Sequence, residues 1–289
     1  MGCYNVRLYE YHKSYQIRLY KKCITNKKGT LKESLSENLP KREKSKKDIP
    51  PEYRVRSQRQ IEHSLYVAQN RSKQNIYRIT RANRWDWFVT LTFSPDKVDR
   101  SSYDDCRKAV SKFFDNVKQR YSPGLRYIVI PELHEDGKSY HFHGLLADCD
   151  GLTFVDSKVR QKGKKVYNLQ QYNLGFSTCT KVTDTRRVSS YITKYITKEL
   201  QAHIKGKRRY LASNNCERGE LTEFKVFEEE KAELLAYCSL CEEIGHMKSQ
   251  TLGGQCINYI ELLADDSNDT LKFLLESFGN QTRERQRFG

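Results

Sequence analysis

The segment 125–146 reads LRYIVIPELHEDGKSYHFHGLL and decides which fold this chain can adopt. Two apolar runs, 125–133 and 139–146, have the residue types of β-strands and flank the short polar stretch HEDGK. Within that stretch, Asp136-Gly137 is a strong signal for a two-residue hairpin turn. A turn at this position places Glu132 opposite His141 in the next strand. The segment therefore predicts an antiparallel β-hairpin with a defined register.

Strand and helix patterns surround this hairpin along the chain. The aromatic, β-branched run WDWFVTLTF (85–93) and the run LGFSTCTKV (174–182) predict strands, and 207–213 predicts a short edge strand. Helical patterns cover three further segments: 55–80, 102–121 and 185–203. Together these elements predict an α+β fold, in which helices lie mainly on one face of an antiparallel sheet of four or five strands.

Charge and apolar content divide the chain into three parts. The formal net charge of +16 favours an anionic partner such as nucleic acid. Residues 1–54 are Lys-rich, so we expect a basic, flexible N-terminal region. Residues 55–215 hold the strand patterns and form the predicted folded domain, whereas residues 216–289 are acidic and predict a mostly helical extension. No apolar run is long enough to span a bilayer and no signal-peptide core is present, so we expect a cytoplasmic protein without membrane contacts.

Two histidines stand two residues apart in the second strand of the hairpin. Because residues i and i+2 of a strand project to the same face, the imidazoles of His141 and His143 point to one spot. Cross-strand pairing adds the carboxylate of Glu132 to that face. Two imidazoles and a carboxylate suit a divalent cation and leave positions open for a substrate. His134 shares the face, nearer the turn, and is the alternative third ligand.

The tandem sequence YITKYITK (191–198) lies in the last predicted helix. At 100° per residue, both tyrosines and both lysines fall within one arc of the helix surface: Tyr191, Lys194, Tyr195 and Lys198. A phenol is a poor nucleophile at neutral pH because its pKa is about 10. A neighbouring ammonium favours the phenolate, so the repeated motif suits a tyrosine nucleophile. The alternative is an ordinary amphipathic helix whose tyrosines lie at the boundary of the core.

Three motifs resemble those of rolling-circle replication initiators in the HUH endonuclease superfamily, whose name describes two histidines separated by a bulky apolar residue. The motifs are WFVTLTF, PELHEDGKSYHFHGLL and YITKYITKEL, in this order, and the similarity extends over about half of the chain, residues 71–213. The paired tyrosines resemble those of the two-tyrosine initiators of small single-stranded DNA phages and some plasmids.

The resemblance implies a ferredoxin-like or RRM-like sheet with the HUH strand at its centre and the tyrosine helix lying across the site. Residues 55–215 would then be a nicking and joining endonuclease domain. His141, His143 and Glu132 would hold Mg²⁺ or Mn²⁺, and Tyr191 and Tyr195 would be the nucleophiles. Lys194 and Lys198 would hold phosphate or assist proton transfer.

The activity implied by this resemblance is site-specific nicking and rejoining of origin DNA through a 5′-phosphotyrosine link. The expected partners are single-stranded or supercoiled origin DNA, together with a helicase and a DNA polymerase of a bacterial host. The sequence has no GxxxxGK[ST] phosphate loop, so no nucleotide cofactor is expected.

Basic and aromatic residues outside the motifs are candidate DNA contacts: Lys205, Lys207, Arg208, Arg209 and Trp85. The alternative for the four basic residues is a solvated loop without a DNA contact. Core packing is expected for at least one of Trp85 and Trp87. Two alternative functions remain open at this point. One is a relaxase or transposase of the same superfamily, and the other is a non-catalytic nucleic-acid-binding module, which explains the charge but leaves the histidines and tyrosines without a role.

Overall fold

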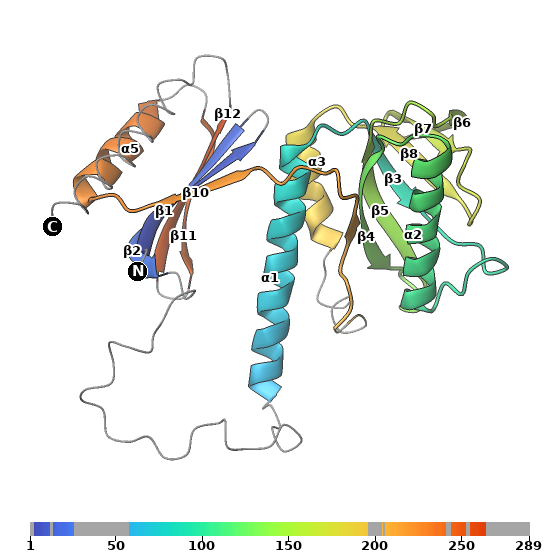
Figure 1. Ribbon diagram of the computed structural model, residues 1–289, viewed down its shortest axis with the longest axis horizontal. Coiled ribbons are helices and arrows are strands. Elements are labelled where there is room, and N and C mark those ends of the chain that lie inside the picture. Colours follow the sequence, from blue (N-terminus) through green and yellow to red (C-terminus); the bar gives the residue numbers. More distant parts are fainter. Residues whose placement is uncertain are drawn as a thin grey trace. The chain divides into compact units, whose positions relative to one another are not determined.

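The computed structural model describes residues 3–11, 14–25, 58–195, 204, 206–240, 244–252 and 255–263 (Figure 1). It divides into two compact units. The larger unit is Arg56–Arg218, and the smaller unit combines Met1–Val55 with Gly219–Gly289. Among the described residues, no helix is both long and apolar enough to cross a membrane.

A seven-stranded antiparallel sheet forms the centre of the larger unit, with the strand order β6-β7-β8-β3-β5-β4-β9. The strands are β3 (Trp87–Leu91), β4 (Arg126–Leu133), β5 (Tyr140–Ala147), β6 (Phe154–Gln161), β7 (Lys164–Leu169), β8 (Ser177–Lys181) and β9 (Leu211–Ala212). The α+β class is confirmed, and β5, which carries the two histidines, lies in the interior of the sheet. The sheet has more strands than the expected four or five, because the β6–β7 hairpin has few apolar residues and gives no strand pattern in the sequence.

Helices lie on both faces of this sheet. They are α1 (Gln58–Ala82), α2 (Tyr103–Arg120) and α3 (Thr185–Ile192), and α3 continues into a 3₁₀ turn, η2 (Thr193–Tyr195). Helix α2 lies on one face and α3 on the other, where α1 packs against α3 (Figure 1). Tyr103 of α2 packs against Tyr140 of β5 at 5.6 Å between ring centroids. Tyr195 of η2 stacks on His143 of the same strand at 3.9 Å. Because Tyr140 and His143 differ by an odd number of residues, they point to opposite faces.

Three features of its sequence stabilise helix α2: an N-cap, charges that match the helix dipole, and one apolar stripe. The Ser102 hydroxyl accepts a hydrogen bond from the Asp105 amide and caps the N-terminus. Acidic residues in the first turn and basic residues in the last turn oppose the helix dipole. One stripe of the helix is buried in the core: Cys106, Val110, Phe113, Phe114 and Val117. The expected amphipathic helix at 102–121 is therefore confirmed.

The smaller unit is built from both ends of the chain, which corrects two expectations. Its five-stranded sheet has the order β10-β1-β2-β12-β11. The elements are β1 (Cys3–Tyr11), β2 (Ser14–Thr25), β10 (Glu220–Phe224), α5 (Glu228–Leu240), β11 (Ile244–Leu252) and β12 (Gln255–Leu263). The N-terminal region is therefore ordered over 3–11 and 14–25, and the segment after Arg218 contains more strands than helices in its described part. The rest of the region expected to be flexible, mainly residues 26–54, lies outside the described residues.

Pairing between distant segments explains this difference. Val6, Leu8 and Ile17 form a buried cluster with Ile260 and Leu262, side chains that are more than 200 residues away along the chain. In addition, the Asn5 side-chain amide donates to the Val226 carbonyl at 2.7 Å and accepts from the Val226 amide at 2.8 Å. Each segment alone has too few apolar residues to form a core, so neither was recognised as folded from its own composition.

A fragment spanning residues 56–218 is expected to fold on its own. Its core cluster lies entirely between Ile76 and Cys216, so the cut removes none of these packed side chains. Ending the chain at Arg218 while keeping the N-terminus would expose β1 and β2, whose partners β10 and β12 are then missing. Thermal unfolding followed by circular dichroism should show one cooperative transition for 56–218. A fragment without such a transition would contradict the division into units.

Gly144 occupies a position on β5 where two strands approach closely. A Cβ atom there would lie 2.4 Å from Val129 Cγ1 and 2.5 Å from the Ile128 carbonyl oxygen of β4. We expect Gly144→Ala to destabilise the protein by about 3 kcal/mol through overpacking, which lowers Tm by roughly 6–12 °C. Gly124→Ala is the matched control, because the nearest atom to its Cβ is 4.0 Å away. Equal melting temperatures for the two variants would show that β4 and β5 can move apart without lowering the free energy of unfolding.

Candidate functional site

The predicted hairpin register is observed. Glu132 of β4 pairs with His141 of β5, and the strands remain in register from Arg126↔Ala147 to Leu133↔Tyr140. The turn itself differs from the expected Asp136-Gly137 pair. The Gly137 amide donates to the His134 carbonyl at 2.9 Å, so Glu135 and Asp136 are the central turn residues and Gly137 follows with a φ of 66°. The longer turn leaves the pairing of Glu132 with His141 unchanged.

Three side chains converge on one point of the sheet face. Glu132 Oε2 lies 2.9 Å from His141 Nε2 and 2.7 Å from His143 Nε2, and the two imidazole nitrogens are 2.8 Å apart. Neighbouring ligands of an octahedral cation with bonds of about 2.1 Å are about 3 Å apart, so these separations match a shared divalent cation. Among the described residues, this is the one group of three or more His, Cys, Asp or Glu side chains with such spacing.

The electrostatics of this group keep its ligand atoms available. Burial disfavours a charged Glu132, but hydrogen bonds to His141 and His143 outweigh that effect and lower the pKa of Glu132 to about 2. Burial also lowers the pKa of His143, so its imidazole is neutral at neutral pH. His143 Nδ1 lies 3.0 Å from Thr90 Oγ1, a contact that fixes the ring and directs Nε2 toward the other two ligand atoms. The arrangement therefore fits a divalent cation.

His134, the alternative third ligand, lies at the margin of this group. Its ring packs edge-on against His141 with 5.6 Å between centroids, and its side chain is exposed. Its ring nitrogens are not part of the convergent group formed by Glu132, His141 and His143. The geometry thus favours Glu132 over His134 as the third ligand.

Both tyrosines of the tandem motif lie beside this group but in different environments. Tyr195 is 6% exposed and stacks on His143, whereas Tyr191 is 42% exposed. The Tyr195 hydroxyl donates a hydrogen bond of 2.9 Å to the Tyr191 oxygen. The Lys194 ammonium lies over the Tyr191 ring, 3.4 Å from its centroid. The sequence placed these three residues in one arc and did not distinguish the two phenols.

The two phenols differ in acidity for identifiable reasons. The hydrogen bond from Tyr195 lowers the pKa of Tyr191, burial opposes this, and Lys194 lowers the pKa further. Burial and the neighbouring Tyr191 raise the pKa of Tyr195. At neutral pH, Tyr191 therefore has the greater share of phenolate, and its side chain is the more exposed of the two.

The helix that carries the tyrosines is shorter than the predicted 185–203 in its described part. The α-helix ends at Ile192 and a 3₁₀ turn follows to Tyr195. Lys198, the second lysine of the motif, lies outside the described residues. Ile192 is fully buried and anchors this segment in the core.

Trp85 does not have the environment of a DNA contact, which corrects that expectation. It is 4% exposed, and its indole Nε1 donates to the Thr80 carbonyl at 2.8 Å. Trp85 precedes β3 by two residues, and its large ring gains more from burial in the core than from a surface position. Trp87 is partly buried and stacks on Phe154 at 4.0 Å.

The basic run after the tyrosine motif borders a polar cavity of about 610 Å³. Lys207, Arg208 and Arg209 line it together with Lys118 and Arg218. Lys207 also forms a 2.7 Å ion pair with Asp104, so part of its charge is neutralised. Lys205 lies outside the described residues.

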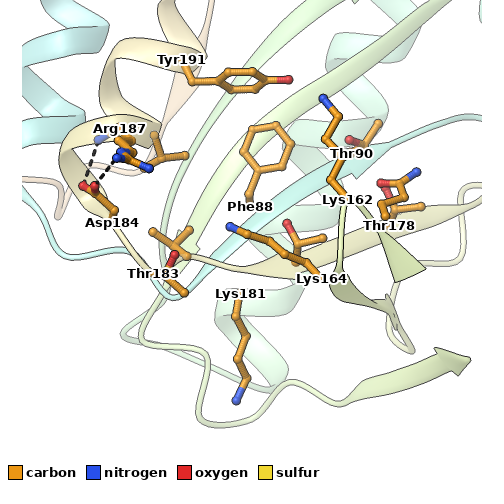
Figure 2. A pocket seen from close by; sticks show the side chains of 14 residues that line it. Phe88, Thr90, Lys162, Lys164, Thr178, Lys181, Thr183, Asp184, Arg187 and Tyr191 are labelled. Carbon is orange, nitrogen blue, oxygen red and sulfur yellow. Dashed lines mark hydrogen bonds and ion pairs between the residues drawn. The ribbon is translucent and has the colours of Figure 1, made fainter. Parts of the chain in front are cut away.

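A second cavity, of about 720 Å³, has Tyr191 in its wall and was not anticipated from the sequence (Figure 2). Phe88, Lys162 and Lys164 also line it. The aromatic and β-branched run of β3 predicted a strand, but the β6–β7 hairpin that supplies both lysines has no strand pattern in its sequence.

Comparison with known proteins gives one match. Residues 86–200 match the sequence model of a family described as "Replication-associated protein ORF2/G2P". No curated protein and no solved structure matches the chain. The matched segment runs from the start of β3 through the tyrosine motif and includes both phenols and the three convergent side chains of Glu132, His141 and His143. Over these residues the chain is similar to replication-associated proteins, which supports its interpretation as a replication initiator.

Proposed function

We propose that this chain initiates rolling-circle DNA replication by nicking and rejoining origin DNA with a tyrosine nucleophile. The observation that carries the proposal is the position of the two phenols beside the convergent ligand atoms, with Tyr195 stacked on His143 at 3.9 Å. A phosphodiester bound there would meet a nucleophile and a cation site at the same time. The match to replication-associated proteins supports the same conclusion.

Glu132, His141 and His143 are the residues that would hold Mg²⁺ or Mn²⁺. When bound, such an ion polarises a non-bridging phosphate oxygen and stabilises the charge that develops during transfer. Thr90 would keep the His143 ring in place through its contact with Nδ1. The low pKa of Glu132, about 2, keeps the carboxylate ionised throughout the physiological range.

Tyr191 is the proposed first nucleophile because it is the more exposed and more acidic phenol. Its oxygen attacks the scissile phosphorus, the bond from phosphorus to the 3′ oxygen breaks, and that oxygen takes a proton to become a free 3′-OH. The protein is then joined to DNA by a 5′-phosphotyrosine. Because one ester bond is exchanged for another, rejoining needs no nucleotide cofactor. The free 3′-OH would prime synthesis by a host polymerase, with strands separated by a host helicase in the cytoplasm of a bacterial host.

Tyr195 first acts on Tyr191 in this proposal and attacks in a later step. Its hydroxyl donates to the Tyr191 oxygen and so stabilises the phenolate. Once Tyr191 is esterified, Tyr195 is the phenol that remains for a second cleavage after one unit of strand has been displaced. Lys194, whose ammonium lies 3.4 Å from the Tyr191 ring centroid, and Lys198 would hold phosphate or assist proton transfer.

Incubation with a supercoiled plasmid that carries the gene and its flanking DNA tests this function directly. With Mn²⁺, we expect open-circular plasmid in which protein is covalently attached to a 5′ end, and with EDTA we expect neither product. DNA binding without nicking under both conditions would contradict the proposed chemistry and would favour the non-catalytic binding module.

The pH dependence of nicking should report the contact between the two tyrosines. Removing the Tyr195 hydroxyl by Tyr195→Phe takes away the main cause of the low pKa of Tyr191. The pKa of Tyr191 then rises, and the rate of adduct formation at pH 7 falls about 10-fold for each unit of that rise. Single-turnover adduct formation, followed from about pH 6 to about pH 10, should therefore reach its plateau at higher pH. An unchanged pH profile would show that the hydrogen bond does not activate Tyr191.

A further inference from the structure

The cavity of about 720 Å³ beside Tyr191 is bordered by β3, β8, the tip of the β6–β7 hairpin and the start of α3 (Figure 2). Its volume lies within the ~300–1,000 Å³ typical of small-ligand sites. In Figure 2, Phe88 occupies the middle of the cavity, with Tyr191, Lys162 and Lys164 around it. Tyr191 lines this cavity, and its oxygen accepts a hydrogen bond from Tyr195, which stacks on His143.

Two ammonium groups in the cavity wall are available for an anion. Lys162 and Lys164 are both exposed, and neither forms an ion pair with a carboxylate of the described residues. Among the other cations of the wall, Arg187 lies 3.3 Å from the Asp184 carboxylate. Lys181 lies 5.8 Å from the centroid of the Trp87 ring, and in Figure 2 its side chain points away from Phe88. The positive charge beside Phe88 therefore comes mainly from the hairpin tip.

The remainder of the wall suits a nucleobase. Phe88 is half-buried and packs edge-on against Tyr191, with 5.7 Å between ring centroids. Hydroxyl groups surround this ring: Thr90, Thr178, Thr180 and Thr183. Aromatic rings for stacking, combined with lysines for the phosphates, are the features by which proteins bind single-stranded nucleic acid.

We propose that this cavity binds the single-stranded DNA next to the scissile phosphate, with Lys162 and Lys164 on its backbone and Phe88 against a base. The position of the strand next to the scissile phosphate rests on the proposed role of Tyr191 as nucleophile. The affinity of the cavity for a single strand does not depend on that role, because binding breaks no bond. The proposal assigns the β6–β7 hairpin as the element that positions the strand. Bases in a duplex are stacked and paired, so a duplex would present its backbone to the lysines without a base for Phe88.

The electrostatics of Tyr191 are consistent with this position of the hairpin. After the hydrogen bond from Tyr195 and the effects of burial and Lys194, the charge of Lys162 is a further cause of the lowered pKa of Tyr191. Lys162 and Tyr191 also line the same cavity, so a strand held by Lys162 would lie in the cavity that Tyr191 borders.

Two double variants of the β6–β7 hairpin distinguish a contact of the cavity lysines with the strand from a general loss of positive charge on the hairpin. Lys162→Gln/Lys164→Gln removes the two cavity lysines. Lys158→Gln/Lys165→Gln removes two exposed lysines of the same hairpin that do not line the cavity. The pairs are matched in charge, and each contains one residue with positive φ, Lys162 at 46° and Lys158 at 61°.

The measurement is fluorescence anisotropy of the full-length protein with a labelled single strand of about 16 nucleotides, in EDTA so that no cleavage occurs. We expect Lys162→Gln/Lys164→Gln to weaken binding about 10-fold and to reduce the slope of log K against log salt by about 1.4, since each phosphate contact on a single strand contributes about 0.7. The control pair should change affinity by less than about 3-fold and keep the slope. Phe88→Leu should weaken binding about 5- to 10-fold without changing the slope, because stacking releases no counterions.

Three results would overturn the proposal. These are equal weakening by both lysine pairs, competition by a duplex of the same length as effective as that by the single strand, and absence of binding to the single strand. Adduct formation on the plasmid is measured separately. If Lys162→Gln/Lys164→Gln weakens binding but the protein never forms an adduct, the assignment of Tyr191 as nucleophile is wrong and the single-strand site is still supported.

Discussion

Tyr191→Phe is expected to abolish the first covalent attachment of the protein to single-stranded origin DNA. Tyr191 is 42% exposed and the more acidic phenol, whereas Tyr195 is 6% exposed and stacked on His143 until the first step is complete. Loss of a nucleophile typically lowers the rate by ~10⁴-fold or more. Denaturing gel electrophoresis of a single-stranded origin substrate labelled at its 3′ end would detect the adduct in Mn²⁺, because this label stays on the downstream fragment that becomes joined to the protein.

The companion variants give this experiment its controls. Tyr195→Phe should still form the adduct, more slowly at neutral pH, because the nucleophile remains and only its hydrogen-bond donor is lost. Tyr191→Phe/Tyr195→Phe should form none. Normal adduct formation by the double variant would disprove the tyrosine assignment, and loss of the adduct in Tyr195→Phe alone would reverse the order of the two phenols.

Glu132→Ala should weaken Mn²⁺ binding by about 10-fold or more, whereas His134→Ala should leave it nearly unchanged. Glu132 Oε2 lies within 2.9 Å of both imidazole nitrogens, and two neutral imidazoles alone hold a hard cation poorly. His134 contacts the edge of the His141 ring and contributes no atom to the convergent group. Titration of the two variants with Mn²⁺, followed by calorimetry, compares them directly.

The two substitutions are matched in position, since both residues lie on the hairpin that carries the histidines. Glu132→Gln is a useful third variant, because it keeps the size of the side chain and removes the charge. We expect it to bind Mn²⁺ more weakly than the unchanged protein. Metal binding that survives Glu132→Ala and is lost in His134→Ala would mean that His134 is the third ligand.

The local features of the site were readable from the sequence because they depend on neighbours along the chain. The period of two in a strand places His141 and His143 on one face. The hairpin register places Glu132 opposite His141, both with the expected Asp136-Gly137 turn and with the observed turn in which Gly137 follows the two central residues. The tandem YITK motif likewise brings Tyr191 and Tyr195 together through one turn of the chain. These distances are set by backbone geometry, so the tertiary structure had little freedom to change them.

Long-range packing decided the remaining features. Burial separates an exposed Tyr191 from a buried Tyr195, and it places Trp85 in the core, although neither outcome follows from residue type. The strands β1 and β2 complete their sheet only with β10 and β12, more than 190 residues later, and the polar β6–β7 hairpin is held by pairing to β8. Such pairings depend on which sheet edges meet in space, and that is determined by the free energy of the whole core rather than by the local pattern of any one segment.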